Sequence, residues 1–186
     1  MRVLGISGSL RRDSHNTRLL RAAASELPPG ARFYLYGEHG QLPPFNQDQE
    51  ADPPASVVRL REAIAGADAV LFATPEYNAS VPGVLKNAVD WASRPPGENV
   101  LREKPMAVIG ASTGVFGAVW AQADLRKSLR SAGAHVADDE LPVAGAEEAF
   151  TPDGGLHDQQ LQERLAALVD DLVREASSPV ERAQAA

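Results

Sequence analysis

The chain has 186 residues, 44% of them hydrophobic, and a formal net charge of −7, which suits one domain with a substantial core. This acidic balance argues against a protein whose main partner is nucleic acid or an anionic membrane surface. Because there is no cysteine, disulfides, thiolate nucleophiles and Cys-ligated zinc or iron–sulfur sites are excluded.

The sequence also argues against a metal site, a signal peptide and a membrane span. The four histidines are scattered without the spacing of a metal-binding pair, so no metal site is expected. The N-terminus does not resemble a signal peptide, and no run approaches the roughly 20 apolar residues of a membrane span. We therefore expect a cytoplasmic protein whose redox chemistry, if any, comes from a bound cofactor.

Short apolar runs alternate with helical patterns along the chain. A loop rich in proline is predicted at 37–54, and the stretch 177–186, rich in alanine and small polar residues, is typical of a disordered tail. The patterns predict strands at 3–7, 33–36, 69–74, 106–111 and 134–137 or further, and helices at 17–27, 56–65, 82–92, 118–132 and 158–175.

This alternation predicts a mostly parallel sheet with right-handed crossovers and helices on both faces. Ligands of such folds bind beyond the carboxyl ends of the strands. Three predicted loops leave those ends, at 8–16, 75–80 and 112–117, and all three are rich in Gly, Ser, Thr and Asn. Their agreement makes this edge the candidate site.

The first loop has the composition of a phosphate site. It places hydroxyls, an amide, backbone N–H groups and the Arg11 charge at the start of a helix. The alternative is an ordinary turn with a helix cap from Ser14, Asn16 or Thr17. Neither G-x-G-x-x-G nor a Walker lysine is present, so a terminal phosphomonoester suits the loop better than a bridging pyrophosphate.

The other two loops suit a planar ring. The backbone N–H groups of Glu76, Tyr77 and Asn78 could donate to the polar edge of a heterocycle, and Tyr77 offers a flat surface. The alternative is a rigid connector, because two prolines and an Asn-containing turn need no ligand. The loop from Ser112 to Gly117 has glycines that permit close approach, and by itself it would be a flexible strand-to-helix turn.

Two sequence blocks make the resemblance specific. Gly8-Ser9-Leu10-Arg11 with Ser14 and Asn16, and the block from Pro75-Glu76-Tyr77-Asn78 to Asp90-Trp91, closely resemble the NAD(P)H-dependent FMN reductase family. This flavodoxin-like group includes bacterial quinone and chromate reductases. The resemblance spans about residues 1–175. It implies an α/β flavodoxin-like three-layer sandwich over residues 1–176, with a five-stranded parallel sheet in the order 2-1-3-4-5.

The resemblance also implies an FMN site. Residues of the first loop would hold the phosphate, residues 75–78 the isoalloxazine, and Ser112 with its neighbours would flank the ring. No catalytic side chain is expected, because the flavin carries the chemistry. The expected FMN-binding residues are Ser9, Leu10, Arg11, Ser14, His15, Asn16, Thr17, Pro75, Glu76, Tyr77, Asn78, Ser112, Thr113 and Gly114.

Three further features bear on the site. Family members often follow the third loop with a second glycine and an arginine, whereas this chain has Ala118-Val119-Trp120, which leaves the contacts of that helix start open. A free Glu76 carboxylate would oppose flavin reduction, so a backbone role is predicted for this residue. Asn87, Asp90 and Trp91 share one side of a helix, which favours a structural or interfacial role over a catalytic one.

The predicted activity is an FMN-dependent oxidoreductase. NADH or NADPH would pass hydride to flavin N5, and a quinone, free flavin, azo compound or metal oxyanion would then take its place in a ping-pong cycle. A homodimer or homotetramer is implied by the resemblance, with Trp91 and Trp120 as core or interface residues. The alternatives are a non-catalytic flavodoxin-like FMN carrier and a Rossmann-type nucleotide-binding module without flavin.

Overall fold

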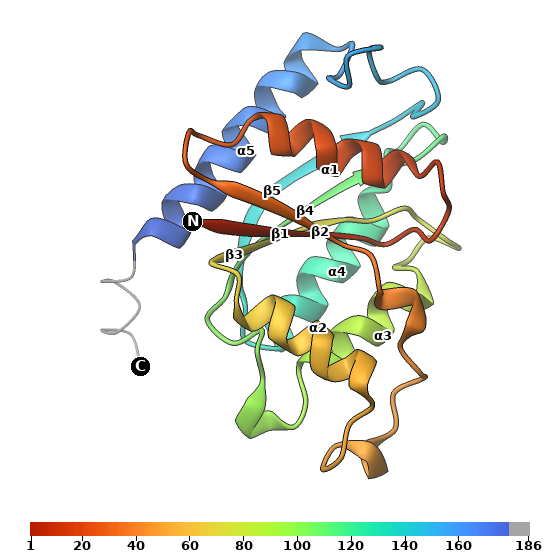
Figure 1. The fold of residues 1–186 in the computed structure, drawn as a ribbon. Helices are drawn as coiled ribbons and strands as arrows, with labels where there is room; N and C mark the ends of the chain where they lie inside the picture. Colours follow the sequence, from red (N-terminus) through yellow and green to blue (C-terminus); the bar gives the residue numbers. More distant parts are fainter. Residues whose placement is uncertain (179–186) are drawn as a thin grey trace.

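The structure is a computed structural model that describes residues 1–178 (Figure 1). Its centre is one parallel sheet in the order β2-β1-β3-β4-β5, which confirms the predicted order and differs from the 3-2-1-4-5-6 order of a Rossmann sheet. The predicted disordered tail falls largely on residues 179–186, which lie outside the described residues. The strands are β1 (Arg2–Ser7), β2 (Arg32–Tyr36), β3 (Ala69–Ala73), β4 (Pro105–Ala111) and β5 (His135–Val143).

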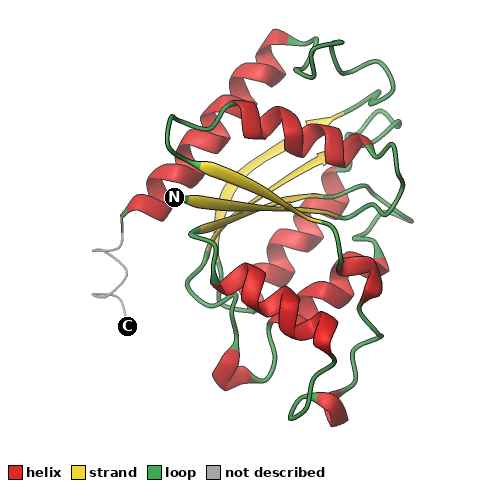
Figure 2. Ribbon diagram, viewed as in Figure 1, coloured by secondary structure: helices red, strands yellow, loops and turns green. Residues whose placement is uncertain are grey.

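Helices cover both faces of the sheet, so the predicted three-layer α/β sandwich is confirmed. α1 and α5 lie on one face, and α2, α3 and α4 lie on the other (Figures 1 and 2). None of the helices within residues 1–178 combines the length and apolarity that crossing a bilayer would need. The helices are α1 (His15–Ser25), α2 (Ala55–Ala65), α3 (Gly83–Ala92), α4 (Val119–Ser131) and α5 (Gln159–Ser177).

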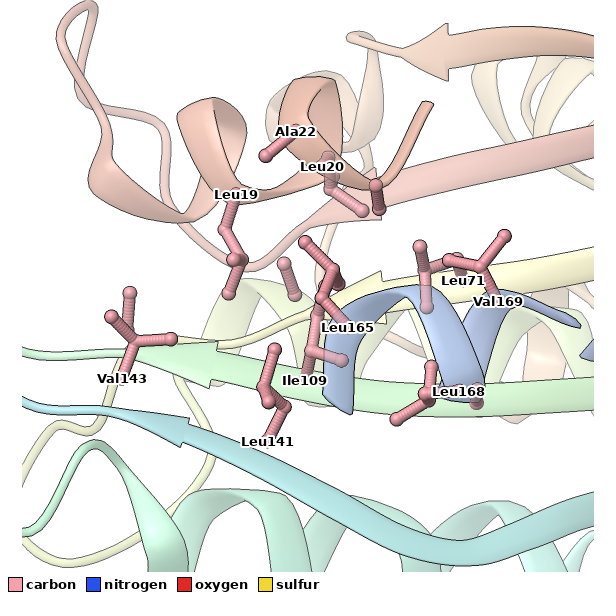
Figure 3. Close-up of a cluster of buried hydrophobic side chains, with 14 of the residues drawn as sticks. Leu19, Leu20, Ala22, Leu71, Ile109, Leu141, Val143, Leu165, Leu168 and Val169 are labelled. Atoms are coloured by element: carbon pink, nitrogen blue, oxygen red, sulfur yellow. The ribbon is translucent and has the colours of Figure 1, made fainter. Parts of the chain in front are cut away.

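The central strands feed two separate cores. In β3, Leu71 belongs to the cluster under α1 and α5, while Val70 and Phe72 belong to the cluster under the other helices. Strand residues alternate between faces, which is why the run from 69 to 73 is apolar throughout. Figure 3 shows the first cluster, with Leu19 of α1 and Leu165 of α5 closing over the sheet. Each such side chain contributes about 1.5–3 kcal/mol on burial.

Strand β5 extends well beyond the four residues at which its sequence pattern is visible. The pattern predicts a strand at 134–137 or further, and the strand continues to Val143 along β4, with a register irregularity between Met106 and Val108. It forms an edge of the sheet, so exposed Asp138 and Asp139 interrupt its apolar pattern. A half-solvated edge strand of this kind hides the alternation that identifies buried strands.

Candidate functional site

Three loops meet at the carboxyl edge of the sheet. Gly8 N–H, after β1, donates to the carbonyl of Ala73 in β3 at 2.7 Å. Asn16, in the first turn of α1, contacts Ala111 at the end of β4. A Cβ added to Gly8 would lie 2.9 Å from Pro75 Cδ, so the first two loops are in direct contact and glycine is required there. The structure thus brings the three predicted segments into one site.

The first loop presents donors at the start of α1. The Ser14 hydroxyl oxygen is the helix cap and accepts from Thr17 N–H at 3.2 Å, while the Ser9 hydroxyl oxygen accepts from Arg11 N–H at 3.3 Å. Both serines are buried, and each keeps its hydroxyl hydrogen for a further acceptor. The N–H groups of the first helical turn, from His15 and Asn16, have no intrahelical partner. The exposed Arg11 guanidinium forms no ion pair within residues 1–178. Hydroxyls, helix N–H groups and a free cation together fit a phosphate.

Asn16 has a different role from the predicted one. Its side-chain Nδ2 donates to the carbonyl of Ala111 at 2.9 Å, and its Oδ1 accepts from Ala111 N–H at 2.9 Å. The residue is buried, with both ends of the amide used by the backbone of β4. The side chain therefore joins α1 to the central sheet, and only the backbone N–H of Asn16 is left to face an anion.

His15 lies in an aromatic stack beside the same loop. Its ring stacks on Phe150 with centroids 6.4 Å apart and planes at 9°, and the Arg18 guanidinium carbon lies 4.5 Å from the Phe150 centroid. Burial, followed by the positive charges of Arg11 and Arg18, lowers the pKa of His15 below its usual 6.5. The imidazole is therefore neutral at pH 7, and the positive potential here comes from the two arginines. The stack depends on a residue 135 positions along the chain from His15, so no local sequence signal could have indicated it.

The second loop is a tight turn. Tyr77 N–H donates to the Ser80 carbonyl at 3.1 Å and Ser80 N–H donates back at 3.2 Å, while Asn78 and Ala79 have φ of 53° and 58°. Positive φ at both central residues is the type I′ geometry. The predicted donation from Tyr77 N–H to a ring is therefore corrected, because this group is used inside the turn. The N–H groups of Glu76 and Asn78 remain, and the Tyr77 side chain is exposed.

The Glu76 side chain joins this turn to α4. Its Oε2 accepts from Trp120 N–H at 3.0 Å and from Ala121 N–H at 3.1 Å. Ala118, the residue just before α4, has no side-chain group that could cap the helix, and it adopts a left-handed φ of 62°. The predicted backbone role of Glu76 is thus incomplete, because its carboxylate is the N-terminal cap of α4. The helix dipole stabilises this negative charge.

The third loop is fixed against β5. Ser112 N–H donates to the Val143 carbonyl at 3.0 Å, and the Ser112 hydroxyl accepts from Gly114 N–H at 3.1 Å. Gly117 has φ of 58°, and an added Cβ would lie 2.5 Å from the carbonyl carbon of Pro142. No other residue fits at this point. The loop therefore holds exposed Thr113 and Gly114 at the edge of the site.

Asn87 and Trp91 of α3 make structural hydrogen bonds. The Asn87 amide accepts from Phe45 N–H at 2.8 Å and donates to the Pro43 carbonyl at 2.9 Å, and Trp91 Nε1 donates to the same carbonyl at 2.8 Å. These bonds fasten the proline-rich loop to α3, which confirms the structural role predicted for Asn87 and Trp91. Trp91 is fully buried and belongs to the core, whereas Trp120 is exposed.

Comparison with known proteins assigns the family. The family model described as NADPH-dependent FMN reductase matches residues 1–148. The chain belongs to this family. It is therefore an oxidoreductase that uses FMN, with NAD(P)H as co-substrate, and the resemblance seen in the sequence is confirmed.

Individual relatives cover nearly the whole reductase. It is 47% identical over 175 residues to an NAD(P)H-dependent FMN reductase of Pseudomonas aeruginosa, covering 90% of this chain and 93% of that protein. It is 42% identical over 170 residues to a quinone reductase of Pseudomonas putida, covering 90% of each. Among solved structures it is similar to the flavoenzyme FerB, an NAD(P)H:(acceptor) oxidoreductase of Paracoccus denitrificans, with a TM-score of 0.83, 41% identity, and 95% and 97% of the two chains covered.

Proposed function

We propose that this reductase transfers two electrons from NADPH or NADH to a small quinone in a ping-pong cycle. The balanced reaction is NAD(P)H plus a proton plus quinone giving NAD(P)⁺ plus hydroquinone. Bound FMN supplies hydride acceptance at N5 and its return to the acceptor. The observation that supports the proposal is the meeting of three loops at one sheet edge: Gly8 brings the hydroxyl-rich first loop against the second, and Glu76 ties the second loop to the start of α4.

Each part of the site has its own task. The Ser9 and Ser14 hydroxyls, the first-turn N–H groups of α1 and Arg11 would hold the FMN phosphate, with Leu10, His15 and Thr17 lining that end. Glu76 and Asn78 would donate backbone N–H groups to the ring, with Pro75 and Tyr77 beside them. Ser112, Thr113 and Gly114 would lie along the ring edge. Neither the capping Glu76 carboxylate nor the neutral His15 ring is placed as a proton donor, so the side chains position the reactants and the flavin performs the chemistry.

Quinones are the preferred acceptors in this proposal because relatives covering nearly the whole chain are quinone reductases. Free flavin, azo compounds and metal oxyanions are the competing acceptors. The proposal also includes one FMN-binding domain over residues 1–176, a homodimer or homotetramer, and a cytoplasmic location without nucleic-acid or membrane partners.

Spectroscopy and steady-state kinetics test the cycle. The purified protein should be yellow, and anaerobic NADPH or NADH should bleach it before any acceptor is added. Double-reciprocal plots at several acceptor concentrations should be parallel. A yellow protein that neither co-substrate bleaches would support the non-catalytic carrier, and intersecting lines would rule out the ping-pong order.

Arg11→Ala tests the phosphate assignment. A charge-assisted hydrogen bond is worth about 1.5–3 kcal/mol, so the FMN Kd should rise about ten- to hundredfold. Arg12→Ala is the matched control, because Arg12 is the next residue and is also exposed. Equal Kd values for Arg11→Ala and the unaltered protein would show that the phosphate lies elsewhere.

A further inference from the structure

Exposed apolar side chains concentrate at the edge that holds the three loops. Among residues 1–178, nine large hydrophobic side chains are exposed, and five of them belong to these loops or to the start of α4. Exposed apolar groups gathered in one place mark a ligand or partner contact, whereas scattered ones need no explanation. The five are Leu10 (58% exposed), Tyr77 (53%), Val115 (80%), Phe116 (60%) and Trp120 (47%).

Phe116 and Trp120 form a defined pair within this group. Their ring centroids are 4.9 Å apart with the planes at 62°, which is the edge-to-face arrangement that aromatic rings prefer. Two contacts fix the backbone that carries the pair. Gly117, between them, is fixed against Pro142, and Trp120 N–H donates to the Glu76 carboxylate at 3.0 Å. The rings are therefore exposed and also anchored.

The same anchor places the pair beside the ring-holding turn. Glu76 immediately precedes Tyr77, so its bonds to the first turn of α4 tie Trp120 to the turn in which Tyr77 is exposed. The two neighbouring carboxylates are both hydrogen-bonded within the fold. The Glu76 carboxylate faces two helix N–H groups, and Asp124, one turn further along α4, accepts from the Ser80 hydroxyl at 2.8 Å. The two rings thus present an exposed apolar surface, edge to face, beside that turn.

We propose that Phe116 and Trp120 form a wall that selects planar, uncharged aromatic acceptors over oxyanions. This inference rests on the proposed function and specifies which acceptors the site prefers. Aromatic faces attract planar rings by stacking and apolar contact. An oxyanion such as chromate would instead require positive charge or several converging donors, whereas these two side chains offer only the single indole N–H of Trp120. Phe116 and Trp120 are thus specificity-determining residues, which gives a role to the helix start at Trp120 that the sequence left open.

The test uses the FMN-loaded protein and four variants: Phe116→Ala, Trp120→Ala, Trp120→Phe and, as control, Val58→Ala. Val58 is an exposed apolar residue on α2, outside the three loops. In a ping-pong cycle kcat/KM for the acceptor reports only the acceptor half-reaction. We therefore measure it for duroquinone and for chromate, and we measure duroquinone binding to the oxidised protein by calorimetry without NAD(P)H.

We expect Phe116→Ala and Trp120→Ala to lower kcat/KM for duroquinone about tenfold relative to chromate and to raise the duroquinone Kd by a similar factor. Trp120→Phe should keep most of the quinone preference in kcat/KM and most of the duroquinone affinity, and Val58→Ala should leave both quantities unchanged. If the two alanine variants still reduce quinones with an unchanged ratio of kcat/KM for duroquinone to that for chromate and an unchanged duroquinone Kd, the proposed function is unaffected and the proposed role of Phe116 and Trp120 is wrong. A changed oligomeric state of the two alanine variants in sedimentation would also overturn it, because the pair would then be a subunit contact.

If the unaltered protein reduces no acceptor, the proposed function fails, and the calorimetric Kd values still decide whether the wall binds a planar quinone.

Discussion

Replacing Asn16 should destabilise the protein even before FMN is bound. Its amide forms two hydrogen bonds of 2.9 Å with Ala111, 95 residues away, and the whole contact is buried. Asn16→Leu keeps a similar volume but strands the N–H and the carbonyl of Ala111 without partners. Asn16→Asp keeps an acceptor for the N–H but places a carboxylate oxygen against the carbonyl, so it should also destabilise.

The magnitude follows from the two stranded groups. A buried backbone donor or acceptor left unsatisfied costs about 1–3 kcal/mol, so two of them give about 2–6 kcal/mol for Asn16→Leu. For a domain of this size, each kcal/mol shifts Tm by about 2–4 °C. A central loss of about 4 kcal/mol therefore lowers Tm by about 8–16 °C.

Urea unfolding of the FMN-free protein, followed by circular dichroism, measures this loss directly. Arg21→Ala is the control, because Arg21 is exposed on α1 and forms no side-chain bond among residues 1–178. A loss below about 1 kcal/mol for Asn16→Leu, combined with a large rise in the FMN Kd, would refute the reasoning. It would show that the side chain serves the phosphate, as its sequence context first suggested.

Two further predictions concern stability. Burial lowers the pKa of His39 below 6.5, and neither ring nitrogen has a hydrogen-bond partner in the described residues, so the unfolded chain binds more protons below pH 6.5. The free energy of unfolding should be constant above pH 6.5 and should decrease as the pH falls below 6.5. In His39→Phe this decrease, measured by urea unfolding at several pH values, should be smaller. An equal decrease in both proteins would contradict the prediction. Gly117→Ala should lower the free energy of unfolding by about 2–5 kcal/mol, because backbone strain adds to the clash with Pro142. Gly145→Ala is the control: its φ is 54° but the space around it is open, so strain alone should cost about 1–2 kcal/mol, and equal losses in urea unfolding would exclude the clash.

The sequence alone determined the framework of this reductase. Continuous apolar runs such as 69–73 identified the buried central strands, because parallel strands covered on both faces need apolar residues at every position. The position of the site followed from the same pattern, since loops at the carboxyl ends of parallel strands share one edge. The family resemblance added the order of the strands and the identity of the cofactor.

The tertiary structure alone decided what individual side chains at that edge do. The amide of Asn16 is used by a residue 95 positions away, and the carboxylate of Glu76 caps a helix 44 positions away. The Tyr77 N–H is used within a turn whose positive φ values no motif specifies. A polar residue's type tells which bonds it can make, but which partner it takes depends on which distant backbone groups would otherwise be buried unpaired. For that reason the exposed pair Phe116 and Trp120 emerged only once the loops were placed in space.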